Sequence, residues 1–125
     1  MRILVADDHE VSRKGICSIL SSRAGMDVCA EASDGQEAIE KALVVKPDMV
    51  ILDFSMPTLD GVSAARTLKQ ILPTVPVIIL SMHKGPQIVQ AAQLAGARGF
   101  VSKSDAGAAL LNAVDVILQG KNFFP

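Results

Sequence analysis

The segment at residues 49–61, "MVILDFSMPTLDG", decides the fold. Its apolar run ends at Asp53, and a Met-Pro pair and an Asp-Gly pair follow at once. Continuous apolar runs are typical of strands buried on both faces of a parallel sheet. Pro57 indicates a turn, and Asp60 stands where a helix N-cap is expected. The segment therefore predicts a central strand, a turn and a helix start. It leaves open whether the Asp53 carboxylate is a cap, a metal ligand or a nucleophile.

A strand followed by a helix is predicted five times along the chain. The apolar runs that predict strands lie at residues 3–6, 28–32, 49–52, 77–80 and 99–101. Apolar residues with helical spacing follow them at 11–20, 38–43, 62–72, 88–95 and 110–118. This alternation predicts an α/β fold, a (βα)5 flavodoxin-like doubly wound parallel sheet.

The order of the strands follows from their polarity. The strand at 28–32 has acidic residues at Asp27 and Glu31, and the strand at 99–101 is short. Both are expected at the edges of the sheet, which gives the order 2-1-3-4-5. Helix N-caps are expected at Asp34, at Asp60 and at Ser104 or Asp105.

Composition limits the classes of function. A chain of 125 residues, of which 50% are hydrophobic and 20% charged, suits one soluble domain. The net charge of −1 gives no general attraction to nucleic acid, and no apolar run reaches the ~20 residues that span a bilayer. Cys17 and Cys29 lack metal-binding spacing, which indicates reduced thiols in a cytoplasmic protein.

Charged and polar residues follow four of the predicted strands. Asp7 and Asp8 follow the first strand, Asp53 the third, Ser81 the fourth, and Lys103 lies just after the fifth. In a doubly wound sheet, sites form where the carboxyl ends of the strands meet. An isolated aspartate in such a place is usually a cap or a turn residue. The five together predict a site at one rim of the sheet.

The chemistry of this group favours a hard divalent ion. Two like charges 4 Å apart cost about 4 kcal/mol at an effective dielectric constant of ~20, and a single lysine does not balance three carboxylates. Oxygen ligands indicate Mg²⁺, with Mn²⁺ as an alternative. The chain has neither GxxxxGK[ST] nor GxGxxG, so a nucleotide site is not expected. The remaining role is a carboxylate nucleophile that accepts a phosphoryl group, and Asp53 on the middle strand is best placed for it.

The whole chain resembles the receiver domain of two-component response regulators. The resemblance lies in "ILVADDHE", "DMVILDFSMPTLDG", "VIILSMH" and "ARGFVSK", in the family's order and at the expected strand ends. "VADDHEVSRKGICSIL" and the closing "GKNFFP" are similar to the NarL/FixJ (LuxR-type) branch. The resemblance implies a receiver domain at residues 1–119. Residues 120–125 would begin a linker to a helix-turn-helix output domain, and this chain would be truncated before that domain.

The resemblance also implies roles for the acidic residues. Asp53 matches the phosphoacceptor, which receives its phosphoryl group from a sensor histidine kinase. Asp8 matches the direct ligand of the metal and Asp7 the ligand that acts through water. The backbone carbonyl of Ser55 matches the third protein ligand. The family regulates and is not a turnover enzyme, so DNA would be contacted only by the missing domain and no membrane is involved.

The remaining family positions include three departures. Lys103 and Ser81 match the residues that contact the phosphoryl group. Phe100 matches the aromatic switch position and is expected to swing inward, although many relatives have Tyr there. Ser104 replaces the proline that usually follows the lysine, so the cis peptide bond of the family is not expected. Met82 is bulkier than the usual residue and is expected to slow access to Asp53.

Three other functions are weighed against this interpretation. A phosphohydrolase of the haloacid-dehalogenase type would carry a second aspartate where Ser55 stands. A flavin or nucleotide module would need a glycine-rich loop. A stand-alone or degenerate receiver that acts only by protein docking would not need the complete site.

A homodimer formed on phosphorylation, through helices 1 and 5 or through the surface of helices 4 and 5, stays open.

Overall fold

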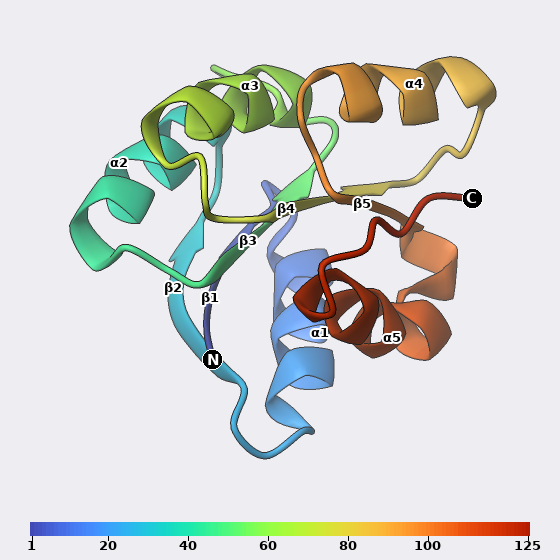
Figure 1. Ribbon diagram of the computed structural model, residues 1–125. Coiled ribbons are helices and arrows are strands. Elements are labelled where there is room, and N and C mark those ends of the chain that lie inside the picture. Colours follow the sequence, from blue (N-terminus) through green and yellow to red (C-terminus); the bar gives the residue numbers. More distant parts are fainter.

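The protein is a single parallel sheet with helices on both faces (Figure 1). The computed structural model describes residues 1–125. The strands are β1 (Arg2–Ala6), β2 (Asp27–Ala32), β3 (Met49–Asp53), β4 (Val77–Ser81) and β5 (Gly99–Ser102). They pair in the order β2-β1-β3-β4-β5. The predicted fold class, strand order and edge strands are therefore confirmed.

The helices form two layers. They are α1 (Glu10–Ser21), α2 (Gly35–Val45), α3 (Gly61–Ile71), α4 (Pro86–Leu94) and α5 (Ala106–Leu118). Figure 1 shows α1 and α5 on one face of the sheet and α2, α3 and α4 on the other. None of these helices combines the length and the apolar character needed to cross a bilayer.

The core has two parts, one on each face of the sheet. Val50 and Leu52 of β3 point into the part under α2, α3 and α4, and Met49 and Ile51 point into the part under α1 and α5. All five residues of β3 are buried, because a central parallel strand is covered from both sides. Val11, the first residue of the predicted helical pattern at 11–20, lies almost fully exposed in the first turn of α1 and does not join the core.

The predicted helix caps are mostly confirmed. Asp34 accepts a hydrogen bond from the amide of Glu37, and Asp60 accepts one from the amide of Ser63. A 3₁₀ turn at Lys103–Asp105 precedes α5, and Asp105 is its N-cap residue but makes no capping hydrogen bond with its side chain. Asp105 is therefore at the predicted N-cap position, but the expected side-chain capping bond is absent. No peptide bond is cis, so Lys103–Ser104 is trans as expected.

The end of the chain packs on the outer edge of β5 (Figure 1). We call residues 121–125 the C-terminal strap. The amide of Phe100 donates to the carbonyl of Phe123 at 2.8 Å, and the amide of Phe123 donates to the carbonyl of Arg98 at 2.9 Å. Phe123 and Phe124 are half-buried against the core. The strap thus adds a short parallel bridge to the edge strand, where residues 120–125 had been expected only to begin a linker.

Candidate functional site

The carboxyl ends of β1, β3 and β5 bring three predicted residues into direct contact. The ammonium of Lys103 lies 2.9 Å from Oδ2 of Asp7 and 3.2 Å from Oδ2 of Asp53. The side chains are almost fully buried, with 9% of Lys103, none of Asp7 and 4% of Asp53 exposed. The attraction between this ammonium and the two carboxylates is strong, because water screens buried charges little.

The backbone around Asp53 is held by the turn that follows it. The amide of Phe54 donates to the carbonyl of Leu80 at 2.7 Å, and the amide of Gly61 donates to the carbonyl of Phe54 at 3.0 Å. A Cβ atom on Gly61 would lie only 2.1 Å from the carbonyl oxygen of Asp53. Glycine is therefore required there by close approach, which the sequence analysis did not foresee.

The pKa values of the two buried carboxyl groups, Asp53 and Asp7, are shifted in opposite directions. Burial raises the pKa of Asp53 to about 6, and the charge of Lys103 only partly offsets this effect. Burial also acts to raise the pKa of Asp7, but hydrogen bonds, including those from the His9 amide and Lys103, hold it below the ordinary value. Burial acts to lower the pKa of Lys103, yet Asp7 and Asp53 raise it, so the ammonium stays charged. Of these two carboxylates, Asp53 is therefore the one whose negative charge is stabilised less by its surroundings.

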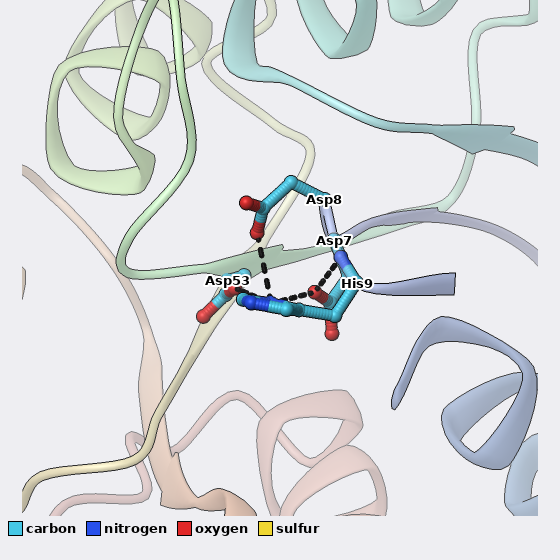
Figure 2. Close-up of side chains that lie close together, drawn as sticks. All are labelled: Asp7, Asp8, His9 and Asp53. Carbon is cyan, nitrogen blue, oxygen red and sulfur yellow. Dashed lines mark hydrogen bonds and ion pairs between the residues drawn. The ribbon is translucent and has the colours of Figure 1, made fainter. Parts of the chain in front are cut away.

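His9, which is not among the residues predicted for the site, also lies beside the carboxylates. Nδ1 of His9 lies 3.1 Å from Oδ1 of Asp8, 3.5 Å from Oδ1 of Asp7 and 4.0 Å from Oδ2 of Asp53. Figure 2 shows its ring between the Asp8 and Asp53 side chains. The sequence shows that His9 stands at the rim but not the direction of its ring. Its place right after the acidic pair was the signal available.

The cluster fits a divalent ion. The cluster consists of four residues that each offer one ligand atom, and these atoms lie within 4.8 Å of one another: Asp7, Asp8, His9 and Asp53. Oδ1 of Asp8 is buried and accepts no hydrogen bond, which is costly unless a cation is bound there. Oxygen-rich ligand sets suit Mg²⁺ and Mn²⁺. An open hollow leads to the cluster and is lined by Asp8, His9, Phe54, Ser55, Met56, Pro57 and Asp60.

The other predicted residues stand nearby without joining the ion pairs. Ser81 is buried, and its hydroxyl accepts a hydrogen bond from the amide of His83 at 3.0 Å. Phe100 is 2% exposed, so its ring is already buried in this structure and the expected inward swing would not start from an exposed ring. Ser55 is exposed in the turn after β3, and Met82 is also exposed beside Ser81.

These features define a class of protein, a flavodoxin-like α/β domain with an acidic, lysine-bearing site at the carboxyl rim of its sheet. The chain matches the response regulator receiver domain over residues 3–115. It belongs to that family, whose members are regulatory domains of two-component systems.

Known relatives place the chain near the NarL/LuxR type. It is 36% identical to the transcriptional regulatory protein DegU of Brevibacillus brevis over 96% of this chain and 51% of that protein. It is 36% identical to the oxygen regulatory protein NreC of Staphylococcus epidermidis over 98% of this chain and 57% of that protein. The chain thus spans about half the length of these relatives.

Solved structures agree with this placement. A LuxR-family two-component response regulator from Aurantimonas sp. SI85-9A1 has a TM-score of 0.94 and 35% identity over 98% of this chain and 88% of that chain. The isolated REC domain of RcsB from Salmonella enterica serovar Typhimurium, in the presence of the phosphomimetic BeF3⁻, has a TM-score of 0.91 and 29% identity over 100% of this chain and 93% of that chain.

Proposed function

We propose that this chain is a phosphoacceptor that takes a phosphoryl group on Asp53 from the phosphohistidine of a sensor histidine kinase. The observation that carries the proposal is a buried carboxylate, Asp53, paired with Lys103 at 3.2 Å beside two further carboxylates. In the transfer, an oxygen of Asp53 forms a bond to phosphorus while the phosphorus–nitrogen bond of the donor breaks. The released imidazole takes a proton from solvent.

The residues around Asp53 would serve this reaction in distinct ways. Near neutral pH the Asp53 carboxyl is largely ionised, because its pKa of about 6 lies below that pH, and only the ionised form is a nucleophile. The Lys103 ammonium, 3.2 Å from Oδ2 of Asp53, would bind the incoming phosphoryl oxygens. Ser81 would donate its hydroxyl proton to them, while its oxygen can still accept from the amide of His83.

The acidic residues would hold Mg²⁺, or Mn²⁺ in its place. Asp8 and Asp53 would be direct ligands, together with the backbone carbonyl of Ser55, and Asp7 would act through water. When bound, the ion supplies positive charge that neutralises the transferring group. The orphaned oxygen of Asp8 supports its part in this set.

Phosphorylation would act as a switch. It adds about −1.5 to −2 charge at Asp53, which draws Lys103 and Ser81 toward the new oxygens. Movement at Ser81 would allow Phe100 to reorient and the surface of α4, β5 and α5 to repack, shifting a pre-existing equilibrium. We propose that the switch controls a DNA-binding output domain, as the transcriptional role in the names of its relatives suggests. A homodimer is one form in which the switch would be read, and the chain would work in the cytoplasm.

The test is phosphorylation with labelled acetyl phosphate and MgCl₂, comparing the wild type with Asp53→Asn. The wild type is expected to carry an acid-labile, hydroxylamine-sensitive label that Asp53→Asn lacks and that EDTA prevents. Asp27→Asn, an exposed aspartate of β2, is the matched control and should label like the wild type. Equal labelling of Asp53→Asn and the wild type would contradict the assignment. A wild type without label would support a degenerate receiver.

A further inference from the structure

His9 is held at the site by its backbone while its side chain is left without a structural role. Its amide donates to Oδ1 of Asp7 at 2.9 Å, and its carbonyl accepts from the amide of Arg13 at 2.9 Å. It is the N-cap residue of α1, yet its side chain makes no capping hydrogen bond. The two backbone bonds fix where the imidazole starts, and nothing in α1 uses the ring.

The ring nitrogen nevertheless faces the carboxylates. Three carboxylate oxygens lie 3.1, 3.5 and 4.0 Å from Nδ1, but the ring is in no hydrogen bond with any of them. Oδ1 of Asp8 has no hydrogen-bond partner although Nδ1 of His9 is its near neighbour. The ring and the carboxylate thus face each other without a direct bond between them.

These separations match those between ligands of one ion. With metal–ligand bonds of about 2.1 Å, neighbouring ligands of an octahedral ion lie about 3.0 Å apart and opposite ones about 4.2 Å apart. Nδ1 lies 3.1 Å from Oδ1 of Asp8 and 4.0 Å from Oδ2 of Asp53, the two carboxylates proposed as direct ligands, and both distances fall within these limits. Little movement of His9 would be needed to share an ion with Asp8. With 68% of its side chain exposed, the ring is free to adjust.

We propose that His9 is a specificity-determining ligand of the metal site, supplying one imidazole nitrogen to a set of oxygen ligands. Imidazole suits first-row transition ions, whereas Mg²⁺ prefers oxygen. The site of this chain is therefore expected to bind Co²⁺ and Zn²⁺ much more tightly, relative to Mg²⁺, than the carboxylates alone would. This inference rests on the metal site of the proposed function and goes beyond it in naming the ion class.

Calorimetric titration of the metal-free chain with Mg²⁺ and with Co²⁺ tests this selectivity. His9→Gln replaces the nitrogen by an amide that can still offer oxygen. We expect it to weaken Co²⁺ binding at least about tenfold, since even losing a residue that only orients a ligand costs about 10–100-fold. Mg²⁺ binding should change by less than about threefold. His83→Gln alters the other histidine of the chain, which is exposed and outside the cluster, and should bind both ions like the wild type.

Nitrogen-15 NMR of the imidazole rings gives a direct readout with Zn²⁺. Because the chain has two histidines, the His9 ring is easily assigned with His9→Gln as reference. Zn²⁺ is expected to shift the nitrogen-15 resonance of one ring nitrogen of His9 and to leave the resonances of His83 unchanged. Unchanged His9 nitrogens, or an equal loss of Mg²⁺ and Co²⁺ affinity in His9→Gln, would overturn the inference.

The proposed function and this inference fail in different ways. If Asp53 accepts phosphate with Mg²⁺ and His9→Gln has unaltered selectivity, the inference alone is wrong. If metal-free wild type binds neither Mg²⁺ nor Co²⁺, both are wrong. A wild type that binds Co²⁺ through His9 but carries no label on Asp53 keeps the inference and overturns the proposed function.

Discussion

The acidic site lies at the carboxyl rim of the sheet, and the C-terminal strap lies along the edge strand β5. Different kinds of interaction hold each of them in place. At the site, buried charges face one another, with Lys103 between Asp7 and Asp53. At the strap, half-buried phenylalanines and backbone hydrogen bonds join residues 121–125 to β5. The site concentrates repulsion between carboxylates, whereas the strap adds apolar contact without any buried charge.

The comparison teaches where stability and function are separated. The site needs a rigid turn, since the carboxylates would otherwise move apart and relieve their repulsion. The strap needs only contact area, so small changes there are absorbed. We therefore expect substitutions to be most costly in the backbone that holds the site, and charge removal in the site to stabilise the fold.

The largest effect is expected for Gly61→Ala. The added methyl group would lie 2.1 Å from the carbonyl oxygen of Asp53, a backbone atom that the β3–β4 pairing holds in place. We expect the free energy of unfolding to fall by about 3 kcal/mol or more, as for other severe clashes, measured by urea denaturation. Gly107→Ala in α5, where nothing lies within 4 Å, should be neutral or stabilising. Equal losses in both variants would show that the turn is not tight.

Asp53→Asn is expected to stabilise the metal-free protein near pH 8. The folded state raises the pKa of Asp53 from 3.8 to about 6, so it holds the proton more tightly than the unfolded chain. Stability therefore falls as pH rises from about 4 to about 6, and the cost stays in place above pH 6. Removing the charge should recover about 1–3 kcal/mol at pH 8 and nothing near pH 3.5.

Thermal unfolding in EDTA at several pH values measures this effect. Asp27→Asn, exposed on β2, is the control and should follow the wild type across the range. Added MgCl₂ should raise the melting temperature of the wild type more than that of Asp53→Asn, because binding to the folded state stabilises it. A wild type as stable as Asp53→Asn at pH 8 would mean that Lys103 fully balances the buried carboxylates.

Phe123→Ala tests the strap. The variant loses a half-buried ring, and we expect about 1–2 kcal/mol of destabilisation by urea unfolding. Amide exchange at Phe100 should become faster, since that amide donates to the carbonyl of Phe123. Leu118→Ala, 52% exposed at the end of α5, should cost less than about 0.5–1 kcal/mol. An unchanged Phe100 exchange rate would show that the strap is held elsewhere.

Much of the fold was predictable from the sequence because it depends on local patterns. Alternating apolar runs and helical spacing identified all five strands and helices, and the acidic residues at Asp27 and Glu31 placed β2 at an edge. The convergence of Asp7, Asp53 and Lys103 followed from the rule that carboxyl ends of parallel strands meet.

The features that were missed depend on contacts between distant residues. The position of His9 depends on the hydrogen bond from its amide to Asp7, and no residue pattern reveals the direction in which its ring turns. The packing of Phe123 depends on β5 having a free outer edge. The closeness of Gly61 to Asp53 depends on the path of the turn.

The smallest effect is expected for Thr58→Gly, in the turn between Asp53 and α3. Thr58 has a φ of 67°, a left-handed conformation that a β-branched residue adopts at a cost. The amide of Leu59 donates to the carbonyl of Pro57 across it, so the turn closes tightly around this residue. Glycine would relieve the strain but would also make the unfolded chain more flexible, and we expect a net gain of up to about 1 kcal/mol. Thr74→Gly, an exposed threonine in a turn without positive φ, should instead lose stability. If both variants lose stability equally, the strain at Thr58 is not stored in the backbone, and the turn owes its rigidity to Gly61 and Pro57 alone.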